Sequence, residues 1–215
     1  LRSPLPRLQA ALALATERNI SSSAIMKQVE PEIQRMDQAI GDMLRYSSLD
    51  KAIKPRSQLV RINKRLAQLK DSETTEALKH DCSIDLNTEK ELVVIGDPEL
   101  LVSGFENIVR NAIRYAPKGT TIDIVAHSEP SSQHANGLII VSIGDRGPGV
   151  SKEHLDHIFD PYFKIDAHQQ QHQSTGLGLA IVKRVFEHHG GSVTAKQRKG
   201  GGLSIIVELP AAIIG

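Results

Sequence analysis

Asp145-Arg-Gly-Pro-Gly149 is the stretch on which the interpretation of the whole chain depends. The apolar run of residues 137–144 comes directly before it, which predicts a strand with the Asp145 carboxylate at its end. A carboxylate only accepts hydrogen bonds, so its natural partner is a donor such as the exocyclic amino group of adenine. Gly147 and Gly149 lack a Cβ, so the backbone can turn tightly and let a flat ligand come close.

A second glycine motif follows in residues 175–179, Thr-Gly-Leu-Gly-Leu, at the start of a helical pattern. We expect this helix to run from about residue 176 to residue 189. The first N–H groups of a helix have no partner within it, and the glycines leave them unobstructed. This arrangement is typical of a phosphate site.

Two asparagines come earlier, on a helix predicted over residues 98–115. Asn107 and Asn111 lie one turn apart and Arg114 follows at i+7, so all three fall on the polar face of a largely apolar helix. One asparagine on a helix is usually solvated, and one pair of glycines is usually a plain turn. The three motifs in this order together indicate a nucleotide-binding site.

These motifs resemble the nucleotide-binding boxes of the sensor histidine kinases of bacterial two-component systems, and the match spans nearly the whole chain. The envelope and osmotic sensors of Gram-negative bacteria are the most similar branch. Residues 1–5, Leu-Arg-Ser-Pro-Leu, resemble the segment that directly follows the phosphoaccepting histidine in this family. The boxes are formed by residues 107–111, 145–149, 159–163, 175–179 and 200–204.

The resemblance implies an α+β protein with two parts. Residues 1–54 would form an antiparallel helical hairpin and a linker, the hairpin being half of a dimeric four-helix bundle. Residues 55–215 would form the catalytic domain, a two-layer α/β sandwich of the ATP-binding type found in gyrase, Hsp90 and histidine kinases. The alternative for the hairpin is packing against this downstream domain. Apolar residues recur over about 1–18 and then with coiled-coil spacing at Ile25, Val29, Ile33, Met36, Ile40 and Met43 or Leu44.

The order of the elements expected in residues 55–215 predicts a mixed sheet covered by helices on one face, because the late strands follow one another without helical crossovers. Strands are expected at residues 59–62, 82–86, 92–95, 121–125, 138–143, 192–195 and 203–209. Helices are expected at residues 63–78, 98–115, 151–158 and 176–189.

ATP and Mg²⁺ are the cofactors that the resemblance implies. Asn111 would be the metal ligand, since Mg²⁺ takes a few protein oxygens besides phosphates and water. Asn107 would lie near the phosphates and take part in catalysis. Tyr115 is equally well explained by core packing. Lys164 lies in the polar segment between Phe159 and Thr175, which resembles a mobile lid, and is equally well explained by solvation. The implied nucleotide-binding residues are Asn107, Asn111, Arg114, Tyr115, Asp145, Gly147, Gly149, Lys164, Thr175, Gly176, Leu177, Gly178 and Leu179.

Asn107 stands where related ATPases have a glutamate that activates water. An amide accepts a proton poorly near neutral pH, so transfer to another nucleophile is favoured over hydrolysis. The resemblance implies transfer of the γ-phosphate to a histidine two positions before Leu1, and then to an aspartate of a response regulator. None of the nine histidines of this chain lies in that motif. The alternatives are an ATP-binding regulatory module without kinase activity and a hydrolytic ATPase of the same fold.

Ser3 lies one helical turn after the position expected for the phosphoaccepting histidine. Many relatives have a threonine or asparagine there, which orients water for dephosphorylation of the regulator. A serine hydroxyl can form similar hydrogen bonds. Phosphatase activity that depends on Ser3 is therefore a further hypothesis.

The composition argues against a nucleic-acid-binding protein, a disulfide-bonded protein and a membrane-spanning chain. Lys+Arg 26 against Asp+Glu 25 gives a net charge of +1, which offers no electrostatic case for nucleic acid. The single Cys82 excludes an internal disulfide and fits a reducing compartment. No run approaches the ~18 apolar residues of a membrane span. We therefore expect this chain to be soluble. The resemblance implies that it is the cytoplasmic portion of a bacterial inner-membrane protein, with a second copy of the chain and a response-regulator receiver domain as partners.

Overall fold

The structure is a computed structural model that describes residues 57–165 and 175–212, and in the N-terminal part residues 29, 33, 36, 40–44, 46 and 47. The chain divides into two compact units, residues 1–47 and 48–215. Every described position of the first unit is helical. The helix predicted over residues 1–18, together with Ser3, lies outside the described residues. The predicted domain boundary at residue 54 stays a prediction.

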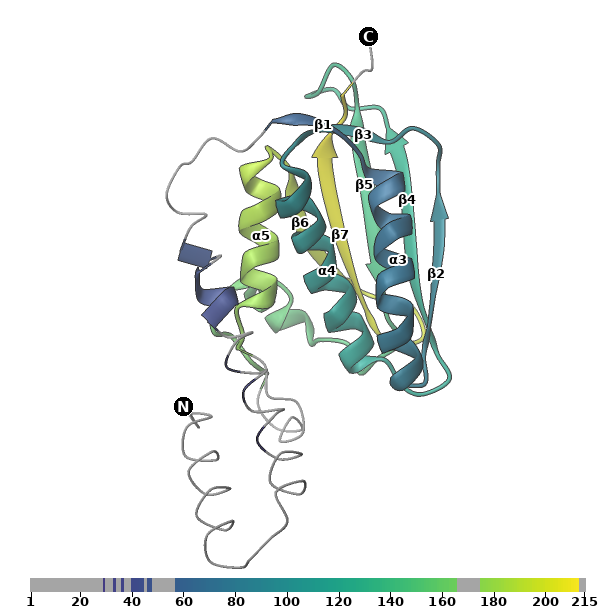
Figure 1. The fold of residues 1–215 in the computed structure, drawn as a ribbon, viewed down its shortest axis with the longest axis vertical. Helices are drawn as coiled ribbons and strands as arrows, with labels where there is room; N and C mark the ends of the chain where they lie inside the picture. The colour runs from purple at the N-terminus through teal and green to yellow at the C-terminus, as the bar shows by residue number, and fades with distance from the viewer. Residues whose placement is uncertain are drawn as a thin grey trace, which may run out of the picture. The chain divides into compact units, whose positions relative to one another are not determined.

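The second unit contains a five-stranded sheet with strand order β2-β4-β5-β7-β6 (Figure 1). β2 and β4 are parallel, and the other neighbouring strands are antiparallel, so the predicted mixed sheet is confirmed. A separate antiparallel pair, β1 and β3, lies at one end. The strands are β1 Gln58–Arg61, β2 Ser83–Thr88, β3 Val93–Gly96, β4 Thr121–Glu129, β5 Leu138–Gly144, β6 Ser192–Gln197 and β7 Leu203–Pro210.

Three helices lie side by side on one face of this sheet, with α4 between α3 and α5 (Figure 1). They are α3 Ile62–Lys79, α4 Pro98–Tyr115 and α5 Gly178–His188. The rings of Phe105 on α4 and Phe186 on α5 are fully buried, with their centroids 4.9 Å apart. The predicted two-layer α/β sandwich is confirmed.

Local sequence explains where the central elements form. Alternate residues of β7 are buried, from Leu203 to Leu209, because successive side chains of a strand point to opposite faces. α4 begins at Pro98 because Asp97 caps it: the Asp97 carboxylate accepts the N–H groups of Glu99 and Leu100 at 2.9 and 3.1 Å.

Two predicted helices differ in the structure. The helix expected at residues 151–158 is a pair of 3₁₀ turns, η1 Lys152–His154 and η2 His157–Phe159, because so short a segment gains little from cooperative α-helix formation. α5 begins at Gly178 and not at residue 176, since Gly176 has a φ of +74° that a helix does not accommodate.

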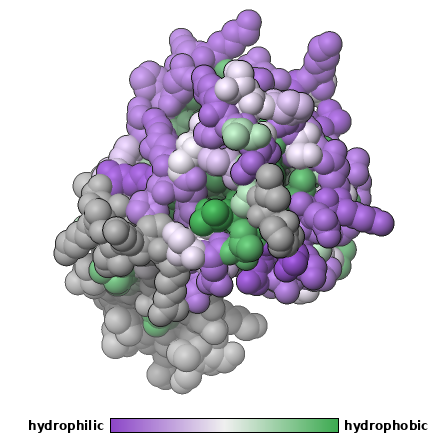
Figure 2. Space-filling view, turned by 90° about the horizontal axis from the view of Figure 1, so that it is seen from above, coloured by the Kyte–Doolittle hydropathy of each residue, from purple (hydrophilic) through white to green (hydrophobic). Residues whose placement is uncertain are grey.

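The surface at the end of the molecule that carries β1 and β3 is mostly hydrophilic, with one small hydrophobic patch (Figure 2). Leu59 and Ile95 are paired across these two strands and are 55% and 59% exposed. Among the described residues, no helix combines the length and the apolar character needed to cross a membrane.

His189 joins the end of α5 to the start of α4. Its Nε2 accepts the N–H of Asp97 at 3.0 Å, and its Nδ1–H donates to the carbonyl of Val185 at 2.6 Å. A Cβ on Gly96 would overlap the imidazole, so the glycine makes room for the ring. Burial, together with the nearby His188, lowers the pKa of His189, while the bond to Val185 and the charge of Asp97 oppose this shift.

We expect the stability of the second unit to fall in mild acid. The pKa of His189 is lower in the folded state than its unfolded value of about 6.5, so its contribution is complete above that pH and is lost as the pH falls toward the folded pKa. Chemical denaturation at a series of pH values measures this. His189→Gln should flatten the curve, whereas His134→Gln, in the loop before β5, should not; a pH-independent free energy of unfolding in the parent chain would contradict the prediction.

Candidate nucleotide-binding site

Asp145 directly follows β5 and is almost fully buried, with 6% of its surface exposed. Its N–H donates to the carbonyl of Leu203 at 3.0 Å. Its carboxylate oxygen Oδ1 accepts the N–H of Gly147 at 2.7 Å and that of Leu203 at 3.3 Å. One carboxylate oxygen is therefore committed to the backbone, which fixes the plane of the carboxylate.

The second oxygen, Oδ2, has a different environment. No described residue donates a hydrogen bond to it, and it is not among the described side-chain atoms that are wholly buried without a partner. Burial raises the pKa of the Asp145 carboxyl, while the N–H groups of Gly147 and Leu203 and the charge of Arg198 oppose the rise. Oδ2 is thus an oriented acceptor at a nearly buried position.

The glycines of this stretch are required by the packing of the protein itself. A Cβ on Gly147 would lie 2.6 Å from the carbonyl oxygen of Tyr115, at the end of α4. Gly149 has a φ of +71°, and its Cβ would lie 3.1 Å from the carbonyl oxygen of Gly202. The sequence suggested close approach of a ligand as the reason for these glycines; the structure adds that residues 145–149 pack between α4 and the β6–β7 turn.

Asn107 connects the asparagine motif to the second glycine motif. Its Nδ2 donates to the carbonyl of Ser103, one turn earlier on α4, at 2.9 Å. Its Oδ1 lies 3.2 Å from the point where a Cβ on Gly178 would be. Gly178 is the first residue of α5, so the carboxamide of Asn107 lies directly against the N-terminus of that helix.

The N-terminus of α5 has no side-chain cap and no acidic residue in its first turn among the described residues. The Thr175 hydroxyl instead accepts the N–H of Leu177 at 3.2 Å, and the Leu177 side chain is buried. The first N–H groups of α5 therefore have no side-chain cap, and the phosphate site expected there stays a prediction.

Gly176 contacts residues 159–163, one of the boxes named above. Residues 166–174, the greater part of the predicted lid, lie outside the described residues. The N–H of Tyr162 donates to the carbonyl of Gly176 at 2.9 Å. A Cβ on Gly176 would lie 2.9 Å from the Cα of Tyr162. This contact fixes the distance between residues 159–163 and residues 175–179.

Gly176→Ala is expected to lower both the free energy of unfolding and nucleotide affinity. The variant combines an unfavourable φ of +74° with the contact to Tyr162, at a total cost of about 2 kcal/mol. Gly119→Ala is the matched control, because Gly119 has a φ of +75° and nothing within 4 Å of its Cβ position. Denaturation and nucleotide titration of both variants separate the two effects, and equal losses would show that the contact with Tyr162 contributes nothing.

Asn111, Arg114 and Tyr115 occupy the last two turns of α4 and are half-buried. The Asn111 carboxamide and the Arg114 guanidinium form no hydrogen bond or ion pair with the described residues. An uncommitted amide oxygen fits the requirements of Mg²⁺, which binds few protein oxygens. No cluster of three or more His, Cys, Asp or Glu suited to a metal occurs within the described ranges. Lys164 is exposed, and its predicted contact with phosphate stays a prediction.

The sequence analysis missed three side chains that support the site. Arg198 donates to the backbone carbonyl of Asp145 and pairs with Asp123, and Gln197 donates to the carbonyl of Val150 at 2.7 Å. The glycine run of residues 200–204 was recognised as a box, but the residues just before it carried no distinguishing pattern. An arginine in a turn is usually solvated.

The fold and the arrangement of these motifs define a class of ATP-binding domain. A family model described as histidine kinase-, DNA gyrase B-, and HSP90-like ATPase matches residues 96–213, and the chain belongs to this family. Within the family, the resemblance to bacterial sensor histidine kinases is confirmed by the curated relatives.

Two of these relatives are sensor proteins of known organisms. The chain is 33% identical over 212 residues to the sensor histidine kinase CpxA of Escherichia coli, covering 98% of this chain and 44% of CpxA. It is 28% identical over 216 residues to the sensor protein SrrB of Staphylococcus aureus, covering 98% of this chain and 36% of SrrB. The chain thus spans less than half the length of these relatives.

Solved structures share the fold at lower identity. The histidine kinase AdeS of Acinetobacter baumannii has a TM-score of 0.78 at 19% identity, covering 99% of this chain and 97% of AdeS. Full-length ShkA, crystallised in complex with AMPPNP, has a TM-score of 0.77 at 22% identity, covering 99% of this chain and 43% of ShkA.

Proposed function

We propose that this chain is the catalytic core of a sensor histidine kinase, which binds ATP with Mg²⁺ and transfers the γ-phosphate to a histidine. The observation that carries the proposal is the Asp145 carboxylate, with Oδ1 fixed by two N–H groups and Oδ2 open. An oriented acceptor selects a base that presents a donor. Adenine presents its amino group, whereas guanine presents the O6 acceptor at the corresponding position.

The phosphates would lie at the other end of the site, at the N-terminus of α5. Its N–H groups and the helix dipole favour negative charge, and no acidic side chain in its first turn opposes them. Asn107 would orient the phosphates, because its carboxamide already lies against Gly178. The positive charges of Arg114 and Lys164 would add to the attraction.

Asn111 would hold Mg²⁺ through its amide oxygen. The metal ion, when bound, neutralises charge on the β- and γ-phosphate oxygens. A neutral amide ligand leaves the positive charge of the ion available to the phosphates. The roles of Thr175, Gly176, Leu177 and Leu179 in this proposal are to shape the backbone that faces the phosphates.

Transfer, and not hydrolysis, is supported by the residue at position 107. A glutamate there could accept a proton from water, but an amide cannot do so usefully near neutral pH. The Nδ2 of Asn107 also donates a hydrogen bond to the carbonyl of Ser103. Catalysis would then rest on positioning and charge stabilisation, as is usual for phosphoryl transfer.

The proposal includes two protein partners. Ile33, Ile40, Met43 and Leu44 are between 49% and 66% exposed within one copy of the chain, and burial against a second copy would remove this apolar surface from water. The phosphate would pass from the histidine to an aspartate of a response regulator, and Ser3 would support regulator dephosphorylation. The chain would be the cytoplasmic part of an inner-membrane protein.

The test is phosphate transfer from γ-labelled ATP, with Mg²⁺, to a longer version of the chain that includes its native upstream residues. We expect a protein-bound label that is lost in acid and retained in base, since the P–N bond of phosphohistidine is labile in acid. No label despite tight ATP binding would overturn the kinase assignment. Steady release of phosphate without a protein adduct would show instead that Asn107 permits hydrolysis.

A further inference from the structure

Arg198 lies just after β6, and its side chain is only 19% exposed. Its Nη1 donates to the backbone carbonyl of Asp145 at 3.0 Å. Its Nη2 pairs with the carboxylate of Asp123 on β4. One planar guanidinium therefore joins the end of β5, the start of β4 and the turn between β6 and β7.

The surrounding backbone is shaped to receive this guanidinium. A Cβ on Gly144 would lie 2.8 Å from Nη1 and 3.1 Å from Cδ and Cζ of Arg198, so the side chain lies directly against the Gly144 backbone. The N–H of Arg198 donates to the carbonyl of Gly202 at 3.1 Å, and Gly202 itself leaves no room for a Cβ beside Asp145. The backbone N–H and the guanidinium of Arg198 are thus both held by hydrogen bonds.

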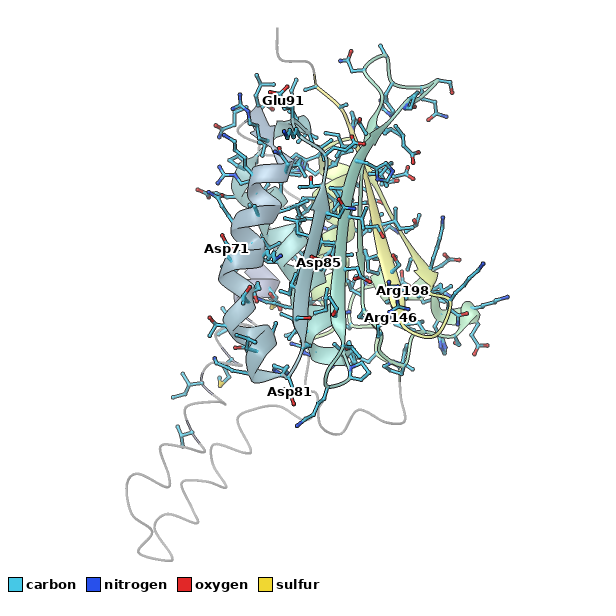
Figure 3. All side chains as sticks on the ribbon, turned by 90° about the vertical axis from the view of Figure 1, so that its right-hand side faces the viewer. Asp71, Asp81, Asp85, Glu91, Arg146 and Arg198 are labelled. Carbon is cyan, nitrogen blue, oxygen red and sulfur yellow. The ribbon has the colours of Figure 1, made fainter. Side chains whose placement is uncertain are left out.

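The neighbouring Arg146 differs from Arg198 although the two lie close together on the side of the sheet away from α3 (Figure 3). The Arg146 side chain is exposed and, among the described residues, donates only to the carbonyl of Lys199, at 3.3 Å. Its guanidinium forms no ion pair with a described carboxylate and no hydrogen bond with the Asp145 carbonyl. Arg146 is therefore next to Asp145 in the sequence but does not hold it in place, whereas Arg198 is distant in the sequence and does.

We propose that Arg198 is a positioning residue for base recognition, which holds the Asp145 peptide in place so that the open carboxylate oxygen keeps its direction toward the base. This inference rests on the proposed function, in which Asp145 selects adenine. The Asp145 carbonyl is held by Arg198, while its N–H and Oδ1 are held by Leu203 and Gly147. Without Arg198, one of these constraints is lost and the carboxylate can rotate with its peptide.

The role predicts a loss of discrimination, and not a general loss of binding. ATP and GTP carry the same triphosphate, so contributions from α5 and the asparagines cancel in the ratio of their dissociation constants. Only groups that respond to the base change this ratio. A purely structural role of Arg198 would weaken the binding of both nucleotides alike.

The experiment measures the dissociation constants of ATP and GTP for the full chain by calorimetric titration. Arg198→Met keeps the aliphatic part of the side chain and should lower the preference for ATP about tenfold, the effect of losing one hydrogen bond to a fixed peptide. Arg198→Lys should give a partial loss, since one ammonium cannot replace both bonds of the planar guanidinium. Lys196→Met, which removes an equal charge from an exposed position on β6, should leave the ratio unchanged.

Asp123→Asn provides an independent check of the same contact. It should lower the preference for ATP in the parent chain and have no further effect in Arg198→Met, because the two residues act through one another. Equal weakening of ATP and GTP binding in Arg198→Met, or a lower melting temperature with an unchanged ratio, would overturn the inference. A parent chain with no preference for ATP would overturn base recognition by Asp145 as well, which distinguishes the two failures.

Discussion

Asp145→Asn is expected to shift the base preference of the site from ATP toward GTP while leaving the fold intact. Gly147 and Leu203 direct two N–H groups at Oδ1. An amide nitrogen placed there would face two donors, so the asparagine oxygen takes that position and its NH₂ group replaces Oδ2. The site then presents a donor to the base, which opposes the amino group of adenine and matches the O6 of guanine.

The expected effect is large because a charged acceptor becomes a misplaced donor. ATP affinity should fall about 10- to 100-fold, given roughly 1.5–3 kcal/mol for a hydrogen bond to a charged group, and GTP affinity should be retained or rise. Calorimetric titration with both nucleotides measures the ratio, and thermal unfolding verifies that the nearly isosteric variant folds. Asp145→Ala is the control, since it removes the acceptor without adding a donor and should weaken ATP without favouring GTP. A parallel loss of both nucleotides in Asp145→Asn would contradict the assignment of Asp145 to the base.

Asn111→Ala is expected to abolish phosphoryl transfer, with a loss on the order of 100-fold or more. The variant removes the only uncommitted amide oxygen on the last two turns of α4 within the described residues, and with it the proposed ligand of Mg²⁺. The side chain is half-buried and makes no hydrogen bond to a described residue, so the fold should not depend on it. Transfer of label from γ-labelled ATP to the longer version of the chain measures the loss.

Two comparisons separate a metal ligand from a general nucleotide contact. Asn111→Asp keeps an oxygen at the same place and should retain part of the activity at raised Mg²⁺ concentration. Nucleotide binding measured with excess chelator should be similar in Asn111→Ala and the parent chain. A loss of metal-free binding as severe as the loss of transfer would show that Asn111 contacts the nucleotide directly.

Local patterns in the sequence were sufficient to predict most elements of the second unit. α4 was predicted at the observed residues, because Asp97 and Pro98 mark its start and its apolar face repeats with the period of a helix. β5 and β7 were recognised as apolar or alternating runs followed by turn residues. The prediction of a helix at residues 151–158 was wrong in detail, because a short segment between turns gives no periodicity that distinguishes an α-helix from 3₁₀ turns.

The sequence by itself determined the chemistry of the candidate site: which residue types occur, in which order, and at which ends of strands and helices. The tertiary structure alone decided which oxygen of Asp145 is free, why Gly147 must be small, and that Arg198 meets Asp123 across 75 residues of sequence. Spacing along the chain reports contacts within a helix turn or a strand, because local geometry fixes them. Contacts between distant strands depend on register and on the packing of the whole sheet, which no local pattern contains.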